Sequence, residues 1–195
     1  HASQLLRESP AIGSDDKHLT DIIQKNAVRV SQIIDTVLEL SRRDKTRQER
    51  LQLDAWLETL ANEFRDTLQL APERLRLTSD LPRVQVQFDP SHLHQVVWNL
   101  CDNAVKHGAG DRSDAVELRA GRVPTSGRPY LEVADRGPGI EAAAAERIFE
   151  PFFTSRASGT GLGLFIAREL AQCNGALLVF EPRRGGGSVF RIVFA

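Results

Sequence analysis

Three carboxamides and one ammonium group recur along a single predicted helix. In the stretch HQVVWNLCDNAVKHG, residues 94–108, Gln95, Asn99 and Asn103 are spaced four residues apart, and Lys106 follows about one turn later. Because an α-helix has about 3.6 residues per turn, these side chains lie along one stripe. The carboxamide oxygen of Asn103 suits Mg²⁺, and Lys106 can meet the charge of a phosphate. A solvated helix face is the alternative, but it does not require three carboxamides at this spacing.

A glycine-rich segment is a second candidate for phosphate binding. In GTGLG, residues 159–163, Gly159, Gly161 and Gly163 surround the start of a predicted helix at Leu162. Without Cβ atoms in the way, the first amides of this helix are open to a ligand, and the helix dipole favours an anion there. Such glycine patterns are common, so this segment alone is weak evidence for a polyphosphate site.

A carboxylate follows a predicted buried strand. Asp135 comes directly after the apolar stretch YLEVA and opens the turn DRGPGI, residues 135–140. A carboxylate at a strand end can accept a hydrogen bond from an exocyclic amino group, such as that of adenine. Gly137 and Gly139 would let a planar ring approach the backbone. An ordinary Asp-Gly turn is the alternative, and by itself this segment favours it.

Composition limits the kinds of partner. The 195 residues contain 25 Lys and Arg against 26 Asp and Glu, a formal net charge of -1, so no general field favours nucleic acid and any phosphate must be bound locally. Cys101 and Cys173 lack metal-ligand spacing and are expected to be small core residues in a reducing compartment. No apolar run approaches the roughly 18 residues of a membrane span, so we expect these residues in the cytosol. The chain has no methionine, and we expect it to be a piece of a longer protein.

Residues 1–43 have the pattern of a helical hairpin with a shortened first arm. The predicted second helix is capped by Asp15 or Asp16, and its seam positions alternate in spacing between four and three residues. These seam positions are Leu19, Ile23, Asn26, Val30, Ile33, Val37 and Leu40. A lone hairpin cannot cover such a stripe, so the pattern favours pairing with a second copy. The charged stretch RRDKTRQER, residues 42–50, predicts a connector, with a charged linker at 44–50 and a hinge between residues 41 and 51.

Residues 51–195 predict an α+β domain, a two-layer α/β sandwich in which helices cover one face of a mixed sheet. We expect a helix capped by Asp54 and ending near residue 68, and another that opens at Asp89 and Pro90. A further helix over 161–173 ends at Asn174-Gly175, and a short helix lies near 141–148. Predicted strands occupy 51–53, 74–79, 84–88, 115–122 and 130–135, followed by a hairpin around 185–187.

Four segments in fixed order resemble a known nucleotide-binding domain. They are NLCDNAVKHG (99–108), DRGPGI (135–140), IFEPFFTS (148–155) and GTGLGLFIARELAQCNG (159–175). Together they resemble the N, G1, F and G2 boxes of the ATP-binding domain of sensor histidine kinases, in the wider family with gyrase B, Hsp90 and MutL. The resemblance covers about residues 51–195 and implies the Bergerat-type ATP-binding fold, with ATP and Mg²⁺ as cofactors.

The resemblance implies a role for each matching residue. Asn103 would be the Mg²⁺ ligand with Asn99 beside it, and Lys106 a phosphate contact; these three are the catalytic candidates. His107 stands where the family more often has an aromatic beside the nucleotide. Asp135 would read adenine, supported by Gly137 and Gly139. The phosphate loop would comprise Gly159, Thr160, Gly161, Leu162 and Gly163.

The segment TSRAS, residues 154–158, resembles a short ATP lid. Its hinge would be the box of Phe149, Phe152 and Phe153, which we interpret as packing rather than chemistry. Arg156 could reach the phosphates or could only solvate the lid.

The hairpin resembles the dimerisation and phosphoacceptor domain of the same kinases. His1 lacks the H-E-hydrophobic-R-N/T-P pattern of their acceptor, and His18, His92 and His94 are also not expected to accept phosphate. HASQLLRES followed by IIDTVLELSRR is similar to the nitrogen-regulation and type IV pilus sensor kinases, which implies an acceptor upstream of His1. This stretch of chain is therefore expected to bind ATP but not to autophosphorylate.

The implied reaction is transfer of the γ-phosphoryl of Mg·ATP to a histidine and then to an aspartate of a response regulator. The subfamily implies a regulator of the sigma-54-dependent activator class and a homodimer formed through the hairpin, without nucleic acid as a partner. It also implies the cytoplasmic portion of an inner-membrane-anchored bacterial sensor.

Three other functions compete with this reading. A hydrolytic ATPase of the gyrase or Hsp90 type holds a water-activating glutamate one turn before its metal-binding Asn, whereas this chain has Asn99 there, and a carboxamide is no general base. A serine protein kinase could use the same nucleotide site, although the heptad hairpin favours the histidine class. A dimerisation module with a decayed site is disfavoured because every residue needed for ATP is present.

Overall fold

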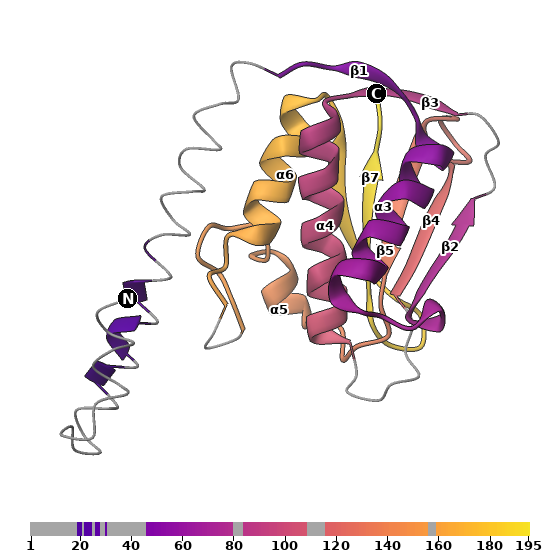
Figure 1. Ribbon diagram of the computed structural model, residues 1–195. Coiled ribbons are helices and arrows are strands. Elements are labelled where there is room, and N and C mark those ends of the chain that lie inside the picture. The colour runs from indigo at the N-terminus through magenta and orange to yellow at the C-terminus, as the bar shows by residue number, and fades with distance from the viewer. Residues whose placement is uncertain are drawn as a thin grey trace.

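The computed structural model describes residues 46–79, 84–108, 116–155 and 159–195, shown in colour in Figure 1. In the N-terminal region it describes residues 19, 20, 22–24, 26, 27 and 30, which are helical, with Leu19, Ile23 and Val30 exposed. Most of the hairpin predicted over 1–43, the start of the linker, and the last three residues of the predicted lid, including Arg156, lie outside the described residues. No helix within the described part of the chain combines the length and apolarity needed to cross a membrane.

A five-stranded mixed sheet forms one layer of the fold. Its strand order is β2-β4-β5-β7-β6, with β2 parallel to β4 and every other neighbouring pair antiparallel. The strands are β2 (Leu75–Ser79), β4 (Val116–Arg122), β5 (Pro129–Ala134), β6 (Leu177–Pro182) and β7 (Ser188–Val193). A separate antiparallel pair joins β1 (Glu49–Gln52) to β3 (Gln85–Phe88), in the register Glu49 opposite Phe88.

Helices form the second layer and lie on one face of the sheet (Figure 1). The long helices are α3 (Leu53–Leu68), α4 (Pro90–His107) and α6 (Gly163–Cys173). The short ones are α5 (Ala142–Ala145) and the 3₁₀ turn η2 (Pro72–Arg74). This arrangement confirms the predicted two-layer sandwich with a mixed sheet.

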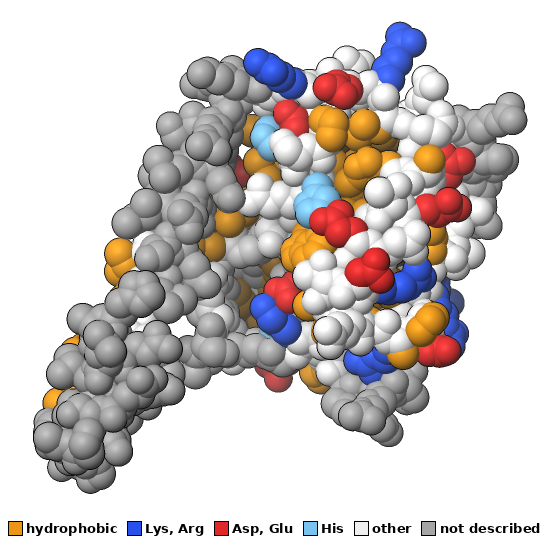
Figure 2. Space-filling model, viewed as in Figure 1, with side chains coloured by type: hydrophobic (Ala, Val, Ile, Leu, Met, Phe, Trp, Pro, Cys, Tyr) orange, Lys and Arg blue, Asp and Glu red, His pale blue; other side chains and the backbone are white. Residues whose placement is uncertain are grey.

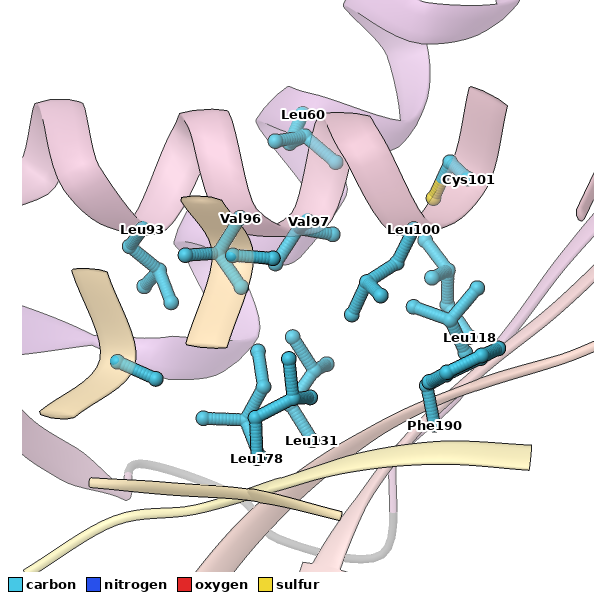
Figure 3. Close-up of a cluster of buried hydrophobic side chains, with 14 of the residues drawn as sticks. Leu60, Leu93, Val96, Val97, Leu100, Cys101, Leu118, Leu131, Leu178 and Phe190 are labelled. Carbon is cyan, nitrogen blue, oxygen red and sulfur yellow. The ribbon is translucent and has the colours of Figure 1, made fainter. Parts of the chain in front are cut away.

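The core lies between α4 and the sheet. Figure 3 shows Leu93, Val96, Val97 and Leu100 of α4 pointing toward Leu131 and its neighbours on the strands. These residues are fully buried, as is Leu118 of β4. Leu178 of β6 is only 3% exposed. Burying one such side chain stabilises the fold by about 1.5–3 kcal/mol. Because this face of α4 is fixed in the core, the rotation of the helix about its own axis is set. Its polar stripe must therefore lie outside the hydrophobic core.

Asp89 caps α4 and joins it to two other segments. Its Oδ1 accepts hydrogen bonds from the amides of Ser91 at 2.9 Å and His92 at 3.3 Å, and Pro90 occupies the first turn, as predicted. Its Oδ2 accepts from the Arg47 amide at 2.8 Å, and its own amide donates to Asn174 Oδ1 at the end of α6. Burial raises the pKa of Asp89, but these hydrogen bonds outweigh burial and hold its pKa below the ordinary value.

The predicted cap of α3 is wrong. The helix begins at Leu53, and Gln52 occupies the N-cap position with extended backbone and no side-chain cap. Asp54 lies inside the first turn, where its carboxylate accepts a hydrogen bond from the Ala55 amide at 2.9 Å. The negative charge also interacts favourably with the positive N-terminal end of the helix dipole. The cause is tertiary: β1 runs directly into the helix, and the Leu53 amide donates to the Val84 carbonyl at 2.9 Å.

Both cysteines are free thiols. Cys101 is fully buried in the core, as predicted, and burial raises its pKa far above the ordinary range. Cys173, near the end of α6, is only half-buried.

Candidate functional site

A cavity of about 970 Å³ lies where α4, the turn after β5 and the start of α6 meet. Its volume is at the upper end of the range for small-molecule sites, about 300–1,000 Å³. Eleven predicted site residues line it: Asn99, Asn103, Lys106, His107, Asp135, Gly139, Gly159, Thr160, Gly161, Leu162 and Gly163. Gly137 and Gln95 do not line it. Residues far apart in the sequence therefore meet at one concave site.

The polar stripe of α4 faces the cavity over its last two turns. Asn99 donates from Nδ2 to the Gly163 carbonyl at 3.4 Å, which ties α4 to the first turn of α6. Within the described residues, the carboxamide of Asn103 has no hydrogen-bond partner, so its oxygen is available to a ligand. Gln95 lies too far toward the start of the helix to take part. The stripe thus contributes two carboxamides to the site rather than three.

Lys106 is held by a neighbour that the sequence reasoning missed. Its Nζ lies 2.6 Å from Oδ2 of Asp102, four residues earlier on α4, and both residues line the cavity. The Lys106 side chain is 58% exposed, so solvent screens this pair. The spacing of four residues was the signal that could have revealed it. An anion at this end of the cavity must compete with Asp102 for the ammonium.

Asp135 is buried and held by backbone amides. Its Oδ1 accepts from the Gly137 amide at 2.7 Å and from the Ser188 amide at 3.2 Å. Its own amide donates to the Ser188 carbonyl at 2.9 Å. No described residue donates to Oδ2, so this oxygen can accept a hydrogen bond from a ligand. The carboxylate is oriented before any ligand arrives.

Gly137 and Gly139 have different surroundings. A Cβ on Gly137 would lie 2.4 Å from the His107 carbonyl oxygen, so the absent side chain lets the turn pack against the end of α4. Gly139 has a φ of +78° and lines the cavity. The turn after β5 is therefore shaped by α4 on one side and open to the cavity on the other.

The glycine loop is joined by its backbone to the phenylalanine segment. The Phe152 amide donates to the Gly161 carbonyl at 3.0 Å, and both residues have left-handed backbone, with φ of +67° and +68°. A Cβ on Gly161 would lie 2.4 Å from the carbonyl carbon of Phe152. Helix α6 begins at Gly163 with Leu162 as its N-cap residue, one residue later than predicted. Its first turn faces the cavity.

Three apolar residues and one serine from distant elements also line the cavity. Ile140 and Ile148 come from the segment after β5, whereas Ser188 and Phe190 come from β7. Sequence reasoning gave β7 no role. The two-residue period of a strand could have predicted that Ser188 and Phe190 point to the same face, but not that they reach this site.

Two members of the phenylalanine box serve in packing. Phe149 packs edge-on against Phe190 at 6.4 Å between centroids, and the Arg168 guanidinium lies over the Phe149 ring at 5.3 Å from its centroid. Arg147 lies 4.8 Å from the centre of the Phe153 ring, which also lines the cavity. Phe152 is 49% exposed. Cation–π contacts of this kind hold the phenylalanine segment that precedes residues 154 and 155.

Comparison with known proteins places these features in a family. Residues 88–195 match the family model of the histidine kinase-, DNA gyrase B- and HSP90-like ATPases. Over its whole length the chain is 40% identical to the sensor protein kinase PilS of Pseudomonas aeruginosa and covers 37% of that protein. Over 98% of its length it is 30% identical to the sensor histidine kinase ZraS of Salmonella typhimurium, of which it covers 40%. The chain spans less than half the length of these curated relatives.

Solved structures have the same fold. The catalytic domain of the histidine kinase ThkA superposes with a TM-score of 0.64 at 25% identity, covering 76% of this chain and 95% of that domain. ThkA in complex with the response regulator TrrA superposes with a TM-score of 0.73 at 22% identity, covering 99% of this chain and 55% of ThkA. At 22% identity this second likeness shows the fold alone.

Proposed function

Because the chain belongs to the histidine kinase-, DNA gyrase B- and HSP90-like ATPase family, we propose that residues 51–195 are the catalytic part of a sensor histidine kinase. The part binds Mg·ATP and transfers the γ-phosphoryl to a histidine, from which it passes to an aspartate of a response regulator. Asn99 is the observation that favours phosphoryl transfer over ATP hydrolysis within the family. It stands where a hydrolytic member would hold a glutamate, and its amide is occupied by the Gly163 carbonyl. A carboxamide cannot activate water as a general base.

The adenine lies at the Asp135 end of the cavity. Oδ2 of Asp135 accepts from the exocyclic amino group, while Oδ1 stays bound to the amides of Gly137 and Ser188. Ile140, Ile148 and Phe190 offer apolar surface for the ring. One oxygen of the carboxylate is therefore used for structure and the other for recognition.

The triphosphate lies toward the start of α6. The glycine loop exposes the first amides of the helix, where the helix dipole favours anions. Lys106 leaves Asp102 and contacts a phosphate, because a multiply charged phosphate group attracts the ammonium more strongly than one exposed carboxylate. Phosphoryl transfer requires positioning and charge neutralisation more than covalent chemistry from the protein.

Asn103 fits the chemistry of a Mg²⁺ ligand. Its carboxamide lines the cavity and has no partner within the described residues, and Mg²⁺ takes few protein oxygens beside water and phosphate oxygens. When bound, the ion neutralises part of the phosphate charge. Asn99 holds α6 against α4, so that the glycine loop and Asn103 keep their spacing.

Several properties of the whole protein belong to the same proposal. The histidine acceptor lies upstream of His1, and the hairpin over 1–43 forms a homodimer. The hinge that brings the nucleotide to the acceptor lies in the charged connector ahead of Arg47, because Arg47 is bound to Asp89 and Glu49 is paired with Phe88. The partner is a response regulator of the sigma-54-dependent class, as in type IV pilus regulation. The chain is the cytoplasmic portion of an inner-membrane-anchored bacterial sensor.

Calorimetry and hydrolysis assays test this function. The chain should bind ATP in the presence of Mg²⁺, hydrolyse it very slowly, and acquire no stable label from γ-labelled ATP. The same chain extended upstream through the acceptor histidine should become labelled and should pass the label to its regulator. Failure to bind ATP would refute the proposal. Rapid hydrolysis that N99A abolishes would instead favour a hydrolytic ATPase, and label that moves only to a serine would favour a serine kinase.

A further inference from the structure

We propose that Arg183 is a positioning residue for base recognition, because it holds Asp135 in place from behind through an ion pair with Glu117. The inference rests on the proposed function, in which Asp135 accepts from adenine. Neither Arg183 nor Glu117 lines the cavity. Arg183 follows β6 in the hairpin that leads to β7, a segment for which the sequence suggested no function.

The guanidinium of Arg183 joins two groups that are distant in sequence. Its Nη1 donates to the main-chain carbonyl of Asp135 at 3.0 Å, and its Nη2 donates to Oε1 of Glu117 on β4 at 2.7 Å. The Arg183 side chain is only 9% exposed and that of Glu117 only 14%. A planar guanidinium can make both bonds at once, whereas the single ammonium of a lysine is a point charge without this fixed geometry.

Glu117 is the charged anchor of this arrangement. It also pairs with Arg119 and lies 4.0 Å from Arg136. Burial raises the pKa of Glu117, but its bonds to Arg183 and Arg119 outweigh burial and hold the pKa below the ordinary value. Glu117 is therefore ionised at neutral pH, and the anchor is permanent under working conditions.

The hairpin tip closes around the same carbonyl of Asp135. Gly187 has a φ of +103°, and a Cβ there would lie 2.1 Å from the Asp135 carbonyl oxygen. The Arg183 amide donates to the Gly187 carbonyl at 3.1 Å, and the next residue, Ser188, donates to the Asp135 carboxylate. Figure 1 shows this tip at the same end of the molecule as the end of α4. Arg183 therefore fixes the loop that supplies one of the two amides on Oδ1.

The test measures binding of ATP and GTP to the full chain, with and without R183Q. Loss of Arg183 should weaken ATP binding about tenfold and reduce the preference for ATP over GTP, because the Asp135 carboxylate is no longer fixed. R183K should recover only part of the affinity. Hydrogen exchange of the Gly137 and Ser188 amides should accelerate in R183Q.

Two matched controls separate positioning from general stability. R119Q removes a second close partner of Glu117 but no contact with Asp135, and R191Q breaks the ion pair to buried Glu132, at 2.6 Å, in the same sheet. Both should keep ATP affinity and base preference within about twofold of the wild type. Unchanged affinity in R183Q, or an equal loss in R191Q, would overturn the inference. Absence of ATP binding by the wild type would instead refute the proposed function on which it rests.

Discussion

The two ends of the cavity are built on different physical principles. At the Asp135 end, the aspartate residue is only 6% exposed, and two backbone amides orient its carboxylate. At the Lys106 end, the lysine side chain is 58% exposed and paired to a neighbour that a ligand must displace. The first end is organised before binding, whereas the second is completed by exchange of partners. In the proposed function, base recognition is therefore a property of the folded core, and charge neutralisation is a response to the ligand.

The largest expected effect comes from removing the preorganised acceptor. In D135N, the amide oxygen can still accept from Gly137 and Ser188, but the new NH₂ group faces the amino group of adenine. ATP affinity measured by calorimetry should fall about 100-fold, and the preference for ATP over GTP should be lost because guanine presents a carbonyl there. Retention of ATP affinity within threefold would show that Asp135 does not read the base.

A glycine pair tests how tightly the phosphate end is fixed by its backbone. Gly161 and Gly127 both have a φ of +68°, but a Cβ would clash with Phe152 only at Gly161, and nothing lies within 4 Å of it at Gly127. G127A should cost about 1 kcal/mol of unfolding free energy, from backbone strain alone. G161A should cost about 3 kcal/mol and weaken ATP binding, because the loop must move. Equal stability losses in denaturant titrations would contradict the close packing at Gly161.

Two charge changes on α4 should act in opposite directions. K106A should weaken ATP binding about tenfold, because it removes a direct phosphate contact. D102N should strengthen ATP binding about two- to threefold at low salt, because Lys106 no longer has to leave the charge of the Asp102 carboxylate, and added salt should erase this gain. Adenosine, which has no phosphates, is the control ligand and should bind both variants like the wild type. A similar loss for adenosine in K106A would indicate a disturbed helix.

The smallest effect concerns the cap of α4, far from both ends. The folded pKa of Asp89 is below its ordinary value of about 4, so its stabilising contribution is present above that pH and is lost as pH falls through the folded pKa. D89N should keep most of the cap, since Asn is also a good N-cap residue, and cost about 1 kcal/mol at pH 7. The stability difference between wild type and variant should shrink below pH 4. A difference independent of pH would show that the carboxylate charge contributes nothing.

Local patterns predicted most of the fold and the residue types of the site. The spacing of Asn99, Asn103 and Lys106 and the glycines near Leu162 depend on helical periodicity and helix ends, which are properties of neighbouring residues. The start of α3 was misplaced because a hydrogen bond from Leu53 to Val84 set it, over a distance of 31 residues along the chain. Ser188, Phe190 and Arg183 were missed for the same reason: only the pairing of β5 with β7 brings them to Asp135. Contacts between strands far apart in sequence leave no local signature.

The hydrogen bond from Phe152 to Gly161 has a consequence for how this loop can change in length. Because it fixes both ends of the segment between them, residues inserted between Ser155 and Gly159 would leave Phe152 and Gly161 paired. Doubling the length of a flexible loop with fixed ends costs only about 0.6 kcal/mol in closure entropy. In the proposed function, the length of the segment predicted as the lid can therefore be altered by engineering with little effect on the Asp135 end of the cavity.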